Sequence, residues 1–176
     1  MHSLSKTDPM SRLFNGSVDP GILGQCGPLV LRLIVGYGFI VHGYAKLARG
    51  PDTFAVVLHT LGVPLPLLLS WLTVLIELGG GIAILIGAFV PIVSLPMAVV
   101  LLTALFTIHL PYGFFSVKLV AVTENGTQFG PVGYEIILLY LASLAALVLG
   151  GAGPLSIDQW RSRRRTRLQC PPDALQ

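Results

Sequence analysis

Residues 27–48 read GPLVLRLIVGYGFIVHGYAKLA, and this stretch decides the class of protein. It is about 22 residues long and would form about 33 Å of helix, which is enough to cross the hydrocarbon of a bilayer. Pro28 stands at its start, where a proline is tolerated in the first turn of a helix. We therefore predict a first membrane span over residues 27–48.

The composition of the whole chain favours a membrane protein as well. Of its 176 residues, 53% are hydrophobic and 11% are charged, whereas soluble domains average about 25% charged residues. A chain of this length cannot bury so much apolar surface in one core and keep a wettable exterior. The chain has room for about four spans of roughly 20 residues each, and we therefore expect no separate soluble catalytic domain.

Three further apolar stretches predict three more spans, over residues 66–88, 91–110 and 132–151. Residues 53–62, TFAVVLHTLG, are apolar on one side and too short to cross, so we expect a short interfacial helix after the first span. The link that begins with PYGFF at residue 111 has aromatic side chains suited to a membrane interface. The predicted fold class is all-α, an integral membrane four-helix transmembrane bundle.

The positive charges outside the spans predict how the chain is oriented. A run of arginines follows the fourth span, and Lys6 and Arg12 precede the first. Because Lys and Arg are enriched on the cytoplasmic side, both termini are predicted to be cytoplasmic, and the run is interpreted as an orientation signal rather than a nucleic-acid-binding tail. The predicted domains are a polar N-terminal segment (1–26), a transmembrane domain (27–160) and a basic tail (161–176). The run consists of Arg161, Arg163, Arg164, Arg165 and Arg167.

Ionisable residues inside the spans are the candidates for a functional site, because such groups are costly in a bilayer and usually face a protein interior or a cavity. Glu77 lies about 16 Å down the second span, near the midplane. Arg32 lies apart, near the cytoplasmic end. The candidates for ligand binding or proton relay, in a pocket that opens outward with Glu77 as its floor, are Glu77, His42, Lys46, His109 and Glu135.

A purely structural interpretation of the same residues stays open. Glu77 could pair with His42 or with a hydroxyl on another span. Lys46, Glu135 and Arg32 could instead extend to the membrane interface, with their apolar stems in the bilayer and their charged ends in water. Glycines on the first and second spans, among them Gly36 and the triplet 79–81, predict close packing of those two helices.

The sequence predicts no catalytic residues and no metal site. It assembles no nucleophile with a base, so an enzyme in its own right is the least supported class. Histidines and carboxylates are suitable metal ligands, but no spacing between them supports a metal site. Cys26 and Cys170 stand near opposite ends and form no CxxC motif.

Three motifs in order carry a family resemblance. LRLIVGYGFIVHGYAKL (31–47) contains Arg32, His42 and Lys46; LGVPLPLLLSWLTVLIELGGGIAILIGAF (61–89) contains Glu77 followed by glycines; LGGAGPLSIDQW (149–160) contains Ser156 and Asp158. In this order, on four predicted spans, the chain resembles the DoxX family of small bacterial four-span membrane proteins over about residues 27–160.

The resemblance implies a place in the bacterial cytoplasmic (inner) membrane and a link to membrane redox systems. It favours a non-catalytic integral membrane subunit of a quinone-linked oxidoreductase assembly. The implied partners are the lipid bilayer and other membrane or redox proteins, with no nucleic acid. The sequence has no recognisable cofactor motif, and quinone is the ligand that the family association implies. The polar residues within the spans favour an alternative, a binding protein or carrier for a small lipophilic ligand such as a quinone or isoprenoid.

Overall fold

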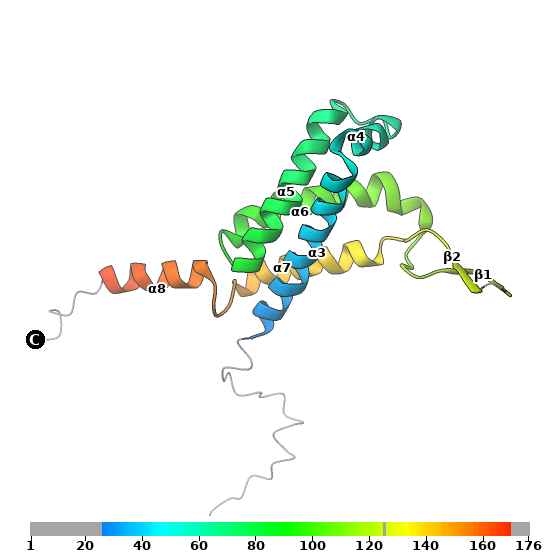
Figure 1. Ribbon diagram of the computed structural model, residues 1–176. Coiled ribbons are helices and arrows are strands. Elements are labelled where there is room, and N and C mark those ends of the chain that lie inside the picture. The colour runs from blue at the N-terminus through cyan, green and yellow to red at the C-terminus, as the bar shows by residue number, and fades with distance from the viewer. Residues whose placement is uncertain (1–25, 125, 170–176) are drawn as a thin grey trace, which may run out of the picture.

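The computed structural model describes residues 26–124 and 126–169, which are mostly helical (Figure 1). The predicted N-terminal segment, apart from Cys26, and the end of the predicted basic tail, including Cys170, lie outside the described residues. The elements in chain order are α3 (Gly27–Arg49), α4 (Pro51–Thr60), α5 (Pro66–Ile86), α6 (Val90–Ala104), the π-helix η1 (Leu105–His109), the 3₁₀-helix η2 (Leu110–Tyr112), β1 (Leu119–Thr123), β2 (Gly126–Phe129), α7 (Glu135–Gly150) and α8 (Ile157–Gln169).

Within the described residues, three helices are long and apolar enough to cross a membrane. They are Gly27–Arg49, Pro66–Ile86 and the continuous helical segment Val90–Tyr112. Each of their bounds lies within two residues of the corresponding predicted span. The apolar surface that these helices leave uncovered is extensive, and on α6 Leu95 is 71% exposed. Such a surface suits lipid rather than water as the solvent.

The fourth apolar helix, α7, is shorter than the predicted span over residues 132–151. It has 16 residues, or about 24 Å of helix. It begins late because the backbone N–H groups of Gly133, Tyr134 and Glu135 donate to carbonyl oxygens of residues 113–115 instead of lying inside a helix. Those bonds tie the start of α7 to the end of the preceding link.

The link between η2 and α7 contains a β-hairpin, which the all-α prediction missed. β1 and β2 pair antiparallel, with Leu119 opposite Phe129 and Thr123 opposite Gly126. The β1 sequence, LVAVT, is rich in β-branched residues, which favour strands. Figure 1 shows the hairpin projecting away from the helices at the far end of α6 and α7.

Helices α3 and α5 pack with their backbones in contact. A Cβ built on Gly36 would lie 2.8 Å from the carbonyl oxygen of Gly81, and one built on Gly81 would lie 2.9 Å from the carbonyl oxygen of Gly36. Only glycine permits this approach, so the predicted close packing of the first two spans is confirmed. Gly79 takes no part in it, since a Cβ there would meet nothing within 4 Å.

Arg32 is 2% exposed, which overturns the interpretation that it extends to lipid head groups. Its guanidinium donates hydrogen bonds to backbone carbonyls at the end of α5 and in the link between α7 and α8. The acceptors, at 2.8–3.3 Å, are the carbonyl oxygens of Ile84, Leu85, Ala152, Pro154 and Leu155. Five donors in a fixed planar group suit this set of acceptors.

The same link and the first turn of α8 close the turn between α5 and α6. Gly87 ends α5 with φ +67°, and a Cβ there would lie 2.5 Å from Ser156 Cβ and 2.8 Å from Arg32 Cζ. Both carboxylate oxygens of Asp158 accept from the backbone, at 2.9 Å from Phe89 N and 3.0 Å from Val90 N, and so cap α6. We call Arg32, Gly87, Ser156 and Asp158 the Arg32 cluster.

Replacing Gly36 by alanine tests the backbone contact. Gly36→Ala should force α3 and α5 apart and lower the thermal unfolding temperature in detergent, because its methyl group would meet backbone atoms of α5. Gly79→Ala is the matched control, since the same change on the exposed face of α5 should be neutral or raise helix stability by up to about 1 kcal/mol. Equal effects of the two changes would contradict this packing.

Replacing Arg32 by lysine tests the cluster. Arg32→Lys keeps the charge but offers three donors instead of five, so backbone carbonyls lose their partners at a cost of about 1–3 kcal/mol each. Thermal unfolding of the purified protein should show a loss of at least about 2 kcal/mol. Arg49→Lys, at the exposed end of α3, should leave the unfolding temperature unchanged. An unchanged Arg32→Lys protein would rule out a structural role for the guanidinium.

Candidate functional site

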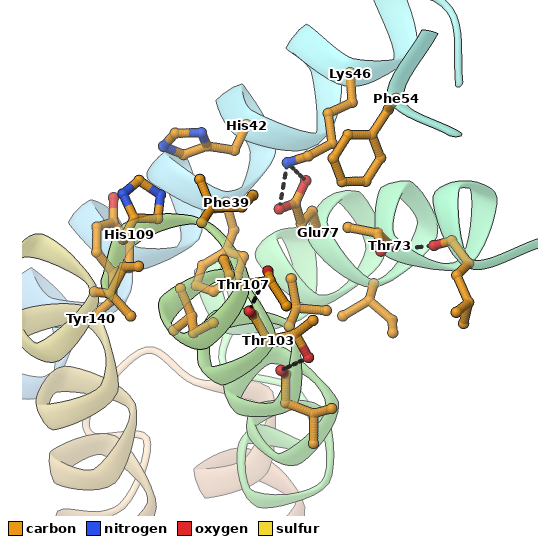
Figure 2. A pocket seen from close by; sticks show the side chains of 18 of the residues that line it. Phe39, His42, Lys46, Phe54, Thr73, Glu77, Thr103, Thr107, His109 and Tyr140 are labelled. Carbon is orange, nitrogen blue, oxygen red and sulfur yellow. Dashed lines mark hydrogen bonds and ion pairs between the residues drawn. The ribbon is translucent and has the colours of Figure 1, made fainter. Parts of the chain in front are cut away.

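A cavity of about 890 Å³ lies between α3, α4, α5, α6 with η1, and α7 (Figure 2). Its volume falls within the range of small-molecule sites, roughly 300–1,000 Å³. Most of its lining is apolar, so the few polar side chains would orient a ligand. These are His42, Lys46, Thr73, Glu77, Thr103, Thr107, His109 and Tyr140.

An ion pair between Glu77 and Lys46 forms part of the cavity wall. Lys46 Nζ on α3 lies 2.7 Å from Oε1 and 2.6 Å from Oε2 of Glu77 on α5. The side chains are 22% and 7% exposed for Lys46 and Glu77. The ammonium also lies 5.3 Å from the ring centroid of Phe54 on α4, within cation–π range. Three helices thus hold one charge pair, and each charge compensates the other where solvation is poor.

The partner of Glu77 is therefore Lys46. The sequence analysis had named His42 or a hydroxyl on another span as the partner. The interpretation that Lys46 extends to the membrane interface is wrong, because its ammonium bonds both carboxylate oxygens. Gly43 brings α3 and α5 close together next to this ion pair. A Cβ on Gly43 would lie 3.0 Å from Glu77 Cβ, so the missing side chain lets α5 approach α3 one turn before Lys46.

Both histidines of the predicted pocket line the same cavity. His109 Nδ1 lies 2.8 Å from the carbonyl oxygen of Val132. A carbonyl only accepts, so Nδ1 carries the proton, and Nε2 of a neutral ring is left as an acceptor. His42 is exposed on α3, and its ring has no hydrogen-bond partner among the described residues. Figure 2 shows the two imidazoles at the same end of the cavity.

The single π-helical turn η1 carries His109 and Thr107 on the cavity wall. Such turns are rare and occur often at functional sites. The hydroxyls of Thr103 and Thr107 donate to backbone carbonyls one turn earlier, at 2.9 and 2.7 Å, so toward a ligand they act as acceptors. The sequence analysis missed η1 and these threonines, because a single π turn has no residue pattern of its own.

Tyr140 on α7 is a further lining residue that the sequence analysis did not include among its candidates. Its ring packs edge-on against Phe39, with centroids 5.6 Å apart. The hydroxyl occupies the space where a Cβ on Gly38 would lie, so this glycine of the first motif makes room for the phenol. A signal for this position existed in the sequence, since Gly38 interrupts an apolar helix between Tyr37 and Phe39.

Glu135, the fifth predicted candidate, does not line this cavity. Its Oε2 accepts from Ser116 N at 3.1 Å, and Ser116 Oγ accepts from Ile136 N at 3.2 Å. This reciprocal arrangement caps the start of α7, where a negative charge is also favoured by the helix dipole. Within residues 26–124 and 126–169, no group of three or more His, Cys, Asp or Glu side chains gathers as a metal site would need.

A mostly apolar cavity with a compensated charge pair in its wall, among three helices long and apolar enough to cross a membrane, fits a membrane protein with an internal pocket. The DoxX family model matches residues 27–110, from the start of α3 to the end of η1 and the first residue of η2. The match confirms the predicted resemblance to the DoxX family over this part of the chain.

A search among curated proteins finds a relative in Haemophilus influenzae, described as an uncharacterized protein. It is 29% identical over 130 residues, which cover 73% of this chain and 85% of the relative. No solved structure matches the chain.

The residues that carried the resemblance fall into two groups in space. Arg32, Ser156 and Asp158 belong to the Arg32 cluster and fix helix ends and links. His42, Lys46 and Glu77 line the cavity. The sequence motifs therefore combine a structural set and a candidate binding set, and the second set lines the cavity of about 890 Å³.

A double-mutant cycle tests the ion pair. Glu77→Leu alone leaves the Lys46 ammonium without its counter-charge and should lower the free energy of unfolding by about 3–5 kcal/mol. Lys46→Met alone should cost a similar amount. The double variant should recover most of the loss, because an apolar pair can replace a buried ion pair. Thermal unfolding in one detergent measures all four proteins, and additive single effects would show that the groups do not interact.

Proposed function

We propose that the whole chain is a DoxX-family protein and forms a four-span bundle in the inner membrane of a bacterium. In this arrangement α3, α5, the segment from α6 through η2, and α7 cross the bilayer, and α4 is the interfacial helix. The support for α7 as the fourth span is its apolar sequence and its place in the core with α3 and α6, through Leu144 and Leu147. Residues 133 and 134, bonded to the preceding link, lengthen it toward the interface.

The proposed orientation places both termini in the cytoplasm. Arg161, Arg163 and Arg164 on α8 are exposed, and the Arg161 guanidinium lies 4.6 Å from the ring centroid of Phe89 at the turn between α5 and α6. Lys and Arg near span ends favour the cytoplasmic side, so that turn is cytoplasmic in the proposal. The cavity belongs to the opposite half of the bundle, toward the outer surface.

We further propose that the protein binds a small lipophilic molecule with a hydrogen-bond-accepting head, such as a quinone, in the cavity. The observation that carries this proposal is the Lys46–Glu77 pair in the wall of an otherwise apolar cavity of about 890 Å³. An ionic group is costly at this depth, and a site for a polar head is the common reason to keep one. Lys46 and the Tyr140 hydroxyl would donate to the head, and the apolar lining would cover the chain.

Membership in a quinone-linked oxidoreductase assembly, as a non-catalytic subunit, is the second candidate function. The family resemblance implies it, and the projecting hairpin favours it. Val120, Val122 and Phe129 on β1 and β2 are 60–71% exposed, and exposed apolar surface of this kind marks contact with a partner. In that setting the bound quinone would be the molecule shared with the redox subunits.

Binding is tested with decylubiquinone and the purified protein in lipid nanodiscs. We expect saturable binding by equilibrium partition, with affinity at least about tenfold weaker in the double variant Lys46→Met with Glu77→Leu, since charge-assisted hydrogen bonds contribute about 1.5–3 kcal/mol. Glu135→Gln, which lies outside the cavity, is the matched control and should bind normally. Unsaturable partition, or equal affinity of the double variant and the unmodified protein, would contradict the proposal.

The assembly is tested by purification in a mild detergent from the native host at native expression. Redox proteins in stoichiometric amounts, identified by mass spectrometry, would support the subunit function. A chain that purifies alone with a bound lipophilic molecule would contradict the assembly and leave ligand binding supported.

A further inference from the structure

The cavity wall includes residues that are themselves on the outer surface of the bundle. On α5, Leu72 lines the cavity and is 46% exposed. On α6, Leu95 and Val99 line it and are 71% and 55% exposed. A side chain that both lines a cavity and is exposed marks the rim of an opening. On α5 and α6 this rim is apolar except for Thr103, whose hydroxyl is bonded to the Val99 carbonyl oxygen.

The two helices touch at one level. Leu72 and Val99 of the rim lie beyond this contact, and Leu95 lies beside it. A Cβ on Gly80 would lie 2.7 Å from Met97 Sδ, so α5 and α6 are in contact there, and Met97 is fully buried. From this contact toward the start of α5 and the end of α6, both helices contribute lining residues instead of packing on each other. Figure 1 shows the second half of α6 running away from α5.

The position of the rim along the helices places it inside the hydrocarbon. At 1.5 Å per residue, Leu72 lies about 9 Å from the start of α5, and Val99 lies about 20 Å from the end of η2. In a core about 30 Å thick, both depths are reached by acyl chains rather than by water. Figure 2 shows the imidazoles of His42 and His109 on the side of the cavity near Tyr140, away from Thr73, the neighbour of Leu72 on α5.

We propose that the cavity opens sideways into the bilayer between α5 and α6, and that its ligand is an amphipathic lipid whose apolar chain leaves through this opening. The polar head then stays with Lys46 and Glu77 inside the bundle. The inference rests on the proposed ligand-binding function and adds the route and the orientation. Exchange takes place within the membrane, and the apolar chain never passes through water.

Two photoreactive quinones test the orientation in nanodiscs. Both are decylubiquinone analogues, one with a diazirine on the last carbon of the chain and one with a diazirine next to the ring. After illumination, labelled peptides are mapped by mass spectrometry, with excess decylubiquinone as competitor. The chain probe should label α5 and α6 at the rim, near Leu72, Leu95 and Val99, and the ring probe should label residues near Glu77.

The outcomes separate the two proposals. Competed ring labelling near Glu77, with chain labelling near His42 and His109 instead of the rim, would overturn the sideways opening and leave the binding site standing. Labelling that decylubiquinone does not compete, with both probes, would overturn the binding function and the orientation together.

A larger side chain at the rim provides a second test, which measures the rate of ligand exchange. Val99→Trp should narrow the opening and slow exchange of bound decylubiquinone with a second nanodisc population at least about tenfold. Leu75→Trp is the matched control, since Leu75 on α5 is 62% exposed but does not line the cavity, and it should exchange at the unmodified rate. Equal exchange rates in the two variants would overturn this route.

Discussion

The contact between Gly36 and Gly81 sets the distance between α3 and α5, and two cations of α3, Arg32 and Lys46, depend on that distance. One turn toward the start of α3, Arg32 reaches the carbonyls at the end of α5; toward the other end, Lys46 reaches Glu77. If α3 and α5 were separated by ordinary side chains, neither cation could keep its partners. In a medium that does not solvate charge, the charges of α3 need partners on α5, and they have these partners only because the two helices are so close.

The cavity follows from the same packing. α5 has its closest approach to α3 along a face with little side-chain volume, and it meets α6 at Gly80 and Met97. At that contact α6 contains Pro96, which cannot donate a backbone hydrogen bond, and farther along the chain comes the π turn η1. A helix with two irregularities need not follow its neighbour, and the space that it leaves is lined from α3, α4 and α7.

The sequence was sufficient for features set by periodicity and depth. Apolar length located the three long helices to within two residues, and glycine spacing predicted the contact of α3 with α5. Depth along the second span put Glu77 on the list of candidates, and it lines the cavity. These inferences need only the geometry of one helix or of two adjacent helices.

Contacts between segments that are far apart in the chain could not be predicted from the sequence. The partners of Arg32 include carbonyls separated from it by 120 to 123 residues. Every residue has a backbone carbonyl, so the amino-acid types at these positions do not reveal that they accept a hydrogen bond. Lys46 was predicted as a pocket residue, but its pairing with Glu77 was not, because its position was assigned from its own helix without the side-chain length that carries its ammonium to α5. Glu135 was predicted to be a pocket residue, whereas its carboxylate accepts from Ser116 N in the arrangement that caps the start of α7.

The sequence separation within the Arg32 cluster has a consequence for biosynthesis. Arg32 belongs to the first membrane-length helix, but Ala152, one of its acceptors, is made 120 residues later. At roughly 5–20 residues per second, translation needs about 6–24 s to produce it. During that interval a guanidinium at a helix end has to be accommodated by water, head groups or the insertion machinery. The link between α7 and α8, which is made late, therefore supplies the last hydrogen-bond acceptors to a charge on the first of the membrane-length helices.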